Sequence, residues 1–255
     1  MSEDRILVNK EEKTCTVVMN RPRIMNALNA DTVENLARTF DRIAGDDEIR
    51  VVILEGAGDN FSSGADVSLF TDNLSAPEWL NEMKKFGQLV RLMREMPQPL
   101  IAKVRGAAIG GGFSLALAAD FVLAAQDARF CLNFVHIGAV LDGGATYFLP
   151  RLVGLVKARE VALLGEFING KTAESLGLIY KSAPGEELDR EVNTLVGTLI
   201  SKSPVSLSLI KKSIESSLDM SLKDVLEWES AHQSVMLQST EHKEMVSFFL
   251  KSRGK

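Results

Sequence analysis

Apolar and polar residues follow different periods in different parts of the chain. Short β-branched and aliphatic runs predict strands at 16–19, 50–54, 100–104 and 121–124. Apolar residues at helical spacing predict a helix over 31–43, between the first two of these runs. Strands that are separated by helices indicate an α/β core with crossover connections.

The pattern changes near residue 190, where the strand-like runs stop. Helical spacing predicts successive helices at 195–200, 205–218, 222–237 and 241–250. We therefore divide the chain into a core at 1–190 and a helical region at 191–255. The apolar residues of the helical region are expected to pack on the core or on another subunit.

Two segments of the core carry glycines at positions where backbone N–H groups could bind a ligand oxygen. The glycines at 110–112 lead directly into strong helix formers, although glycine is a poor way to begin a helix. This makes sense if a ligand must approach the backbone closely at the positive end of the helix, where N–H groups lack partners. A turn at 63–66 carries another glycine. We expect the N–H groups of Ala65 and Gly111 to converge on one oxygen and to stabilise its negative charge.

Composition and charge narrow the function classes. The 255 residues are 45% hydrophobic and 25% charged, as in an ordinary soluble globular protein. A net charge of −5 without a long basic run lacks the electrostatic footprint of nucleic-acid binding. Cys15 and Cys131 lack C-x-x-C spacing and only three histidines are present, so we expect no metal site. The polar N-terminus and the Asp120 within 107–125 predict neither a signal peptide nor a membrane span, hence a cytoplasmic protein.

Five motifs resemble those of the crotonase (enoyl-CoA hydratase/isomerase) superfamily and follow the same order. They lie at 20–28 (NRPRIMNAL), 63–66 (SGAD), 110–112 (GGG), 149–154 (LPRLVG) and 165–177, a segment whose end overlaps AESLGL at 173–178. The resemblance covers nearly the whole chain. It implies a ββα spiral whose C-terminal helical region forms a homotrimer, or a hexamer of two trimers. It implies acyl-CoA substrates, a thioester oxygen between the N–H groups of Ala65 and Gly111, and no cofactor beyond the coenzyme A of the substrate.

The catalytic groups differ from those of the hydratases that this chain resembles. Those enzymes carry two glutamates, at positions that correspond to Ser114 and Phe134. Addition of water needs groups that hold the water and move its protons, but Ser114 is no base and Phe134 can do neither. Hydration by the two-glutamate mechanism is therefore not expected.

A carboxylate follows a little further on, in the segment AVLDGGATY at 139–147. Asp142 stands where certain enoyl- and dienoyl-CoA isomerases carry a catalytic aspartate. Among these are the ring-opening phenylacetyl-CoA epoxide isomerases, which also resemble this chain at Phe134. Its neighbours Phe134, Val140 and Leu141 are expected to desolvate the carboxylate and to raise its pKa. An aspartate before two glycines also fits a helix N-cap, and one oxygen can cap while the other takes a proton.

The predicted reaction is the shift of a double bond, or the isomerisation of a ring, in an enoyl-CoA thioester. Ala65 and Gly111 hold the enolate, and Asp142 moves the proton. Three alternatives stay open: a hydratase in which Asp142 activates water, an aryl-CoA dehalogenase in which it attacks the ring, and a non-catalytic acyl-CoA-binding protein. The segment 112–116 is close to a nucleophile elbow, but no histidine is tied to Ser114, and His136 is expected to be structural.

The resemblance also implies residues that contact the substrate or its coenzyme A. Arg23 falls near the CoA phosphates, and Phe249 and Lys251 fall near residues that a neighbouring subunit contributes. The other expected contacts belong to the motifs or adjoin them: Met25, Ser63, Gly64, Asp66, Val67, Gly110 and Phe134. Apolar residues between 67 and 96, Phe86 among them, are expected to cover the acyl group or to pack their helix on the core.

Overall fold

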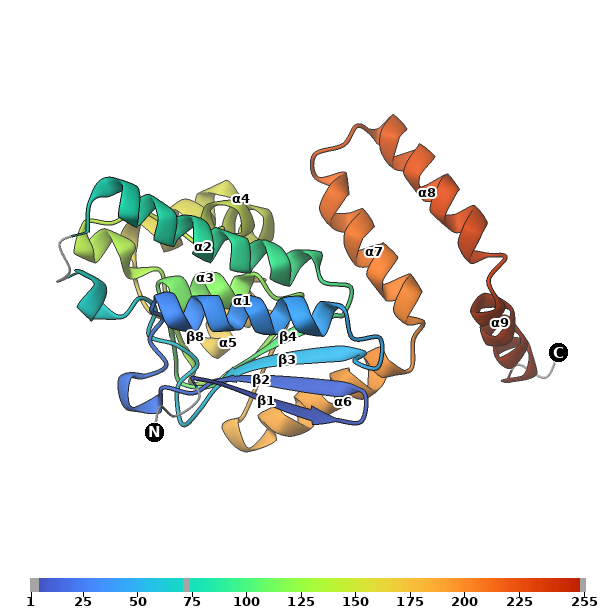
Figure 1. Ribbon diagram of the computed structural model, residues 1–255, viewed down its shortest axis with the longest axis horizontal. Coiled ribbons are helices and arrows are strands. Elements are labelled where there is room, and N and C mark those ends of the chain that lie inside the picture. Colours follow the sequence, from blue (N-terminus) through green and yellow to red (C-terminus); the bar gives the residue numbers. More distant parts are fainter. Residues whose placement is uncertain (1–4, 71–73, 253–255) are drawn as a thin grey trace.

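The computed structural model describes residues 5–70 and 74–252 (Figure 1). Its larger sheet has the strand order β1-β2-β3-β4-β6-β9. β1 runs antiparallel to β2, and the other neighbours in this sheet run parallel. These strands are β1 (Ile6–Glu11), β2 (Thr14–Met19), β3 (Val51–Gly56), β4 (Leu100–Val104), β6 (Phe121–Ala125) and β9 (Lys181–Ala183). A smaller sheet contains β5 (Ala107–Ile109), β7 (Arg129–Cys131) and β8 (Ile168–Asn169).

Nine α-helices alternate with or follow these strands in the part of the chain that is described. They are α1 (Ala30–Ala44), α2 (Ala76–Glu95), α3 (Gly111–Leu117), α4 (Ala145–Leu164), α5 (Gly170–Ser175), α6 (Leu188–Ile200), α7 (Pro204–Ser217), α8 (Leu222–Met236) and α9 (Thr240–Ser252). Short 3₁₀ helices are η1 (Pro22–Ile24), η2 (Val67–Phe70), η3 (Asn133–Ile137) and η4 (Gly185–Glu187). No described helix has both the length and the apolar character that crossing a bilayer requires.

The four predicted strands and the predicted helix are confirmed. The runs at 51–54 and 100–104 form parallel strands that are almost wholly buried, because helices cover both faces of such a sheet. α1 begins where the Asn29 side chain accepts a hydrogen bond from the Thr32 N–H, and it buries Leu36, Phe40 and Ile43. α1 and α2 pack side by side above the sheet (Figure 1).

The C-terminal helices are of two kinds. α6 packs on β3, β6 and β9 through buried leucines and valines, so the division that we predicted after residue 190 falls inside a helix of the core layer. The last three helices, α7, α8 and α9, leave the core layer: α7 contacts it through Lys211 and Glu215, which bond to Asp120 and Arg94, whereas α8 and α9 project away in the single chain (Figure 1). The exposed apolar residues of these three helices include Val205, Ile210, Ile214, Leu218, Leu222, Leu226, Val235, Leu237, Met245, Val246, Phe248, Phe249 and Leu250.

Candidate active site

The glycines before α3 provide one backbone donor. Gly110 has φ 52° and ψ −123°, a backbone conformation that residues with a Cβ rarely adopt. Its N–H donates to the Cys131 carbonyl oxygen at 2.8 Å. The next N–H, that of Gly111, opens α3 and therefore has no acceptor within the helix. A Cβ on Gly112 would lie 2.6 Å from the Ser62 carbonyl oxygen, so glycine here lets α3 pack directly on the 62–66 turn.

That turn provides the second donor. Gly64 has φ +87°, and a Cβ on it would lie 2.6 Å from the Ile109 carbonyl oxygen and 3.3 Å from the Gly111 nitrogen. The Leu28 N–H donates to the Gly64 carbonyl oxygen at 2.7 Å, and the Asp66 N–H donates to the Leu28 carbonyl oxygen at 2.8 Å. These two bonds bracket Ala65, whose own N–H has no acceptor among the described residues. The structure thus brings two unpaired N–H groups together at the start of α3.

Buried polar groups hold this turn in place. The Ser62 hydroxyl is fully buried, donates to the Asn26 carbonyl oxygen at 2.9 Å and accepts from the Gly64 N–H at 3.2 Å. The Asn26 side chain in turn donates to the Ala57 and Asn60 carbonyl oxygens at 2.9 and 2.6 Å. Since each polar atom has a partner, the 62–66 turn is fixed against the loop that follows β2.

Asp66 locks the same turn by an ion pair. Its Oδ2 lies 2.8 Å from Nη2 of Arg21, and its Oδ1 accepts hydrogen bonds from the N–H and hydroxyl of Ser68. Burial opposes ionisation, yet the bonds from Ser68 and Arg21 outweigh it and hold the pKa of Asp66 below its usual value. Asp66, which we expected to contact the substrate, thus has its carboxylate engaged within the protein.

Replacing Asp66 with asparagine is expected to lower the free energy of unfolding by about 1–3 kcal/mol, because a charged hydrogen-bond acceptor is lost. The carboxylate has a lowered pKa in the folded state, so its stabilisation is present above pH 4 and is lost as the pH falls through that lowered value. Urea unfolding at pH 7 and at pH 3 measures the difference. An equal deficit at both pH values would contradict an electrostatic role for this pair.

Asp142 lies next to the Gly111 donor. Its Oδ1 is buried, has no hydrogen-bond partner among the described residues, and lies 3.8 Å from the position that a Cβ on Gly111 would take. Burial raises the pKa of Asp142 to about 6, well above that of an exposed aspartate. A carboxyl group that is half-ionised near pH 6 is suited to take and return a proton at neutral pH.

Two details of our expectations for Asp142 are wrong. The N-cap of α4 is Gly144 without a side-chain bond, and Asp142 contributes only its backbone carbonyl, which accepts from Ala145. Val140 does not desolvate the carboxylate, because it is 84% exposed on a loop that turns outward. The ring that packs on the glycines beside Asp142 belongs instead to Phe86 of α2.

Comparisons with known proteins give the family. A family model for enoyl-CoA hydratase/isomerase matches residues 9–254. The chain belongs to the enoyl-CoA hydratase/isomerase family. It is 34% identical to crotonyl-CoA hydratase of Syntrophomonas wolfei, over 99% of this chain and 97% of that protein. It is 32% identical to 1,2-epoxyphenylacetyl-CoA isomerase of Escherichia coli, over 98% of this chain and 96% of that protein.

Solved structures of the family share the fold. An enoyl-CoA hydratase from Bacillus anthracis has a TM-score of 0.93 at 27% identity and covers 98% of this chain and 97% of its own. A Thermobifida fusca protein in complex with acetoacetyl-CoA has a TM-score of 0.84 at 26% identity, over 91% and 94%. The predicted fold class, a crotonase-type α/β spiral with a C-terminal helical region, is confirmed.

The two positions that carry glutamates in the family's hydratases are occupied by groups without acid–base function. Ser114 is fully buried in α3, and its hydroxyl donates to the Gly110 carbonyl oxygen at 3.3 Å. Phe134 is buried on η3, with its Cζ 4.0 Å from the position of a Cβ on Gly110. His136 lies on the same short helix and its Nε2 bonds the Gly165 carbonyl oxygen at 3.0 Å. Neither Ser114 nor His136 is free to act as a nucleophile–base pair.

The expected coenzyme A contacts lie in two places. Arg23, Met25 and Val67 are exposed near the 62–66 turn, and the Ser63 hydroxyl donates to the Ile24 carbonyl oxygen at 3.3 Å. Phe249 and Lys251 are instead on α9, far from α3 in the single chain (Figure 1). The chain alone therefore brings only the first group to the site.

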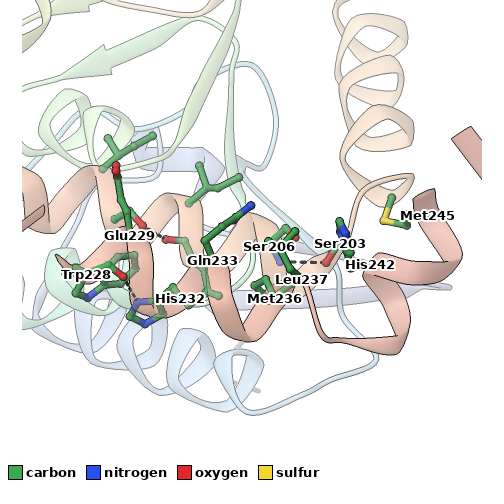
Figure 2. A pocket seen from close by; sticks show the side chains of 14 residues that line it. Ser203, Ser206, Trp228, Glu229, His232, Gln233, Met236, Leu237, His242 and Met245 are labelled. Atoms are coloured by element: carbon green, nitrogen blue, oxygen red, sulfur yellow. Dashed lines mark hydrogen bonds between the residues drawn. The ribbon is translucent and has the colours of Figure 1, made fainter. Parts of the chain in front are cut away.

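A groove separate from this site lies between α7, α8 and α9 (Figure 2). It has a volume of about 580 Å³, and Trp228 and His232 stack along its wall with ring centroids 3.5 Å apart. Figure 2 also labels other lining residues: Ser203, Ser206, Glu229, Gln233, Met236, Leu237, His242 and Met245. It contains no residue of the predicted site, and its apolar lining continues the exposed surface of the projecting helices.

Proposed function

We propose that this family member is an acyl-CoA isomerase that shifts a double bond in an enoyl-CoA thioester. The observation that carries the proposal is one buried, unpartnered carboxylate oxygen beside two unpaired backbone N–H groups. The thioester oxygen of the substrate accepts hydrogen bonds from Ala65 and Gly111, as the family resemblance implies. Those donors stabilise negative charge on that oxygen as it forms.

Asp142 then supplies the proton transfer. With a 3-enoyl-CoA, the carboxylate removes a proton from C2, and the electron pair moves to the thioester oxygen as a dienolate. The carboxylic acid returns the proton to C4, which leaves the double bond between C2 and C3. No oxidant, reductant or water enters the balance, and we propose no cofactor besides the coenzyme A of the substrate. Ring isomerisation of an aromatic CoA ester would use the same enolate and the same acid–base group.

The value of kcat/KM for the isomerisation is expected to follow the ionisation of Asp142. The base must be deprotonated in the free enzyme, so activity is constant above about pH 7 and falls about tenfold per pH unit below an apparent pKa of about 6. Initial rates between pH 4.5 and 8.5, with a substrate that does not titrate in this range, measure the profile. A profile that stays flat down to pH 5 would contradict Asp142 as the base.

Hydration is the second candidate, because crotonyl-CoA hydratase is as similar to this chain as the epoxide isomerase is. In that reaction Asp142 would activate a water molecule at C3. The usual mechanism with two glutamates is not supported, because Ser114 and Phe134 stand at the corresponding positions and neither can transfer a proton. Loss of the conjugated enoyl absorbance of crotonyl-CoA, with formation of 3-hydroxybutyryl-CoA, is the test that separates the two reactions.

We also propose that the enzyme works as a homotrimer or a hexamer. The exposed apolar residues of α7, α8 and α9 and the groove in Figure 2 support this, since contiguous exposed apolar faces mark contacts between proteins. In such an assembly, Phe249 and Lys251 of α9 would reach the coenzyme A of a neighbouring subunit.

A further inference from the structure

α2 supplies an apolar wall to the site from a distant part of the sequence. The helix is fixed at its start by Ser75 and Glu78, which form a capping box, and it buries Phe86, Leu89, Val90 and Met93. Phe86 is only 5% exposed and belongs to the main hydrophobic core. Its burial alone does not distinguish it from the other three, but its contacts do.

The Phe86 ring borders the side-chain position of Gly111 and occupies that of Gly143. A Cβ on Gly111 would lie 3.6 Å from both Cε1 and Cζ of Phe86. A Cβ on Gly143 would lie 2.6 Å from Cε1 and 3.0 Å from Cζ, and 2.8 Å from the Cβ of Ser114. Gly111 carries one of the two donors, and Gly143 follows Asp142 directly. The ring therefore packs on the backbone of Gly143, next to Asp142 in the sequence, and lies beside Gly111, whose Cβ position is 3.8 Å from Oδ1 of Asp142.

We propose that Phe86 is a positioning residue, whose ring excludes water from Oδ1 of Asp142 and holds the carboxylate beside the Gly111 N–H. The role in catalysis rests on the function proposed above, whereas the effect on the carboxylate does not. No hydrogen bond fixes Oδ1 among the described residues, so packing must define its place. Gly143 has φ +56°, which allows the chain to turn so tightly that Asp142, Ser114 and the ring meet.

Charged neighbours do not explain the raised pKa of Asp142. α3 carries no ionisable side chain, and Lys84 of α2 is exposed. The other ionisable side chains that flank the site on α2, α4 and η3 have partners elsewhere. They are Lys85 with Glu34 and Glu82, Arg94 with Glu215, Tyr147 with Arg151, and His136 with the Gly165 carbonyl. Burial is the cause that raises the pKa of Asp142.

A cavity with charged and apolar lining residues adjoins the helix that carries Phe86. Its volume is about 700 Å³, and it is bounded by α2, α4 and α7. Arg94, Lys211 and Glu215 line it, together with Gly87 and Gly144. Gly87 follows Phe86 in the sequence and Gly144 follows Gly143, so the lining of this cavity adjoins both residues of the Phe86–Gly143 contact. Removal of the ring is expected to connect the cavity to Asp142 and to admit water to the carboxylate.

The test is the titration of Asp142 in the ligand-free protein, followed by ¹³C NMR of the aspartate carboxyl groups and assigned by the signal that Asp142→Asn lacks. In Phe86→Ala we expect the proton affinity of Asp142 to fall at least about tenfold, one pKa unit toward that of an exposed aspartate. Leu89→Ala removes a fully buried side chain from the same helix and is the matched control, with an unchanged titration of Asp142. An Asp142 titration in Phe86→Ala that equals that of wild type would overturn the proposal.

Phe86→Leu keeps an apolar side chain and provides a second, milder variant. It is expected to shift the titration in the same direction by less, and to exchange the transferred proton with D₂O faster than wild type during turnover. A shift in Leu89→Ala as large as in Phe86→Leu would also overturn a specific role for the ring. The titration needs no substrate, so isomerisation that survives in Asp142→Asn would refute the proposed function and leave the Phe86 result standing.

Discussion

Replacing Asp142 with asparagine is expected to lower kcat for the double-bond shift by about 10²–10⁴-fold, the usual contribution of one acid–base group. Asparagine has nearly the shape of aspartate but cannot take a proton at neutral pH. The Kd for an acyl-CoA ester should change little, because the backbone donors at Ala65 and Gly111 are untouched. Turnover of a 3-enoyl-CoA and equilibrium binding of a saturated acyl-CoA measure the two effects separately.

The stability of the Asp142→Asn variant shows whether unfolding causes that loss of activity. Burial raises the pKa of Asp142 in the folded state, so its ionised form opposes folding at pH 7. The stability associated with this raised pKa is fully present below pH 4 and is lost as the pH rises through about 6. The asparagine variant should therefore melt no lower than wild type at pH 7. Asp41→Asn, an equal change of charge on the exposed face of α1, is the control and should keep full activity.

Replacing Gly64 with alanine is expected to lower kcat/KM by about 10²–10³-fold, the effect of losing one oxyanion donor. The new Cβ would lie 2.6 Å from the Ile109 carbonyl oxygen and 3.3 Å from the Gly111 nitrogen, and φ +87° is unfavourable for alanine. Relief of the clash must move the turn that carries Ala65 away from α3. The two N–H groups then no longer point at one oxygen. Steady-state kinetics with a 3-enoyl-CoA measure the loss.

Gly197→Ala is the matched control for this change. Gly197 lies on the exposed side of α6, and a Cβ there would meet no atom within 4 Å. Alanine in a helix interior is more favourable than glycine by about 1 kcal/mol, so this variant should keep its activity and gain stability. Full activity in Gly64→Ala, with a circular dichroism spectrum like that of wild type, would contradict the two-donor arrangement.

The elements that the sequence predicted are those with a strong period. The apolar runs of β3 and β4 are buried on both faces, and the stripe of α1 packs on the sheet, so local pattern and tertiary contact agree. β1, β5, β7, β8 and β9 were not predicted. Five of the six residues of β1 are exposed, and its sequence does not alternate between apolar and polar residues. Each of the other four strands has only two or three residues. Strands that short are defined by their pairing partners rather than by their own sequence.

The residues of the site also fall into those that the sequence indicated and those that it did not. The order of the motifs indicated the two donors and the aspartate, and the structure brings all three together. The surroundings of Asp142 were not predictable from adjacent residues, since Val140 turns outward while the desolvating ring comes from α2. The engagement of Asp66 by Arg21 was likewise missed, because the pair joins two loops that are distant in sequence.

The names of the relatives do not separate the two candidate reactions. The chain is 34% identical to a hydratase and 32% identical to an epoxide isomerase, and both matches cover almost all of it. The distinction lies in individual side chains: Ser114 and Phe134 are buried without acid–base function, and Asp142 has a raised pKa beside the donors. Substrate chemistry must therefore be measured directly.

¹H NMR of the purified enzyme with 3-hexenoyl-CoA in D₂O, and in parallel with crotonyl-CoA, distinguishes a site that moves a double bond from one that adds water. We expect conversion of the 3-enoyl to the 2-enoyl ester, with deuterium at no carbon other than C2 and C4, and no 3-hydroxyacyl product from either substrate. Accumulation of 3-hydroxyacyl-CoA without movement of the double bond would contradict the proposed isomerisation.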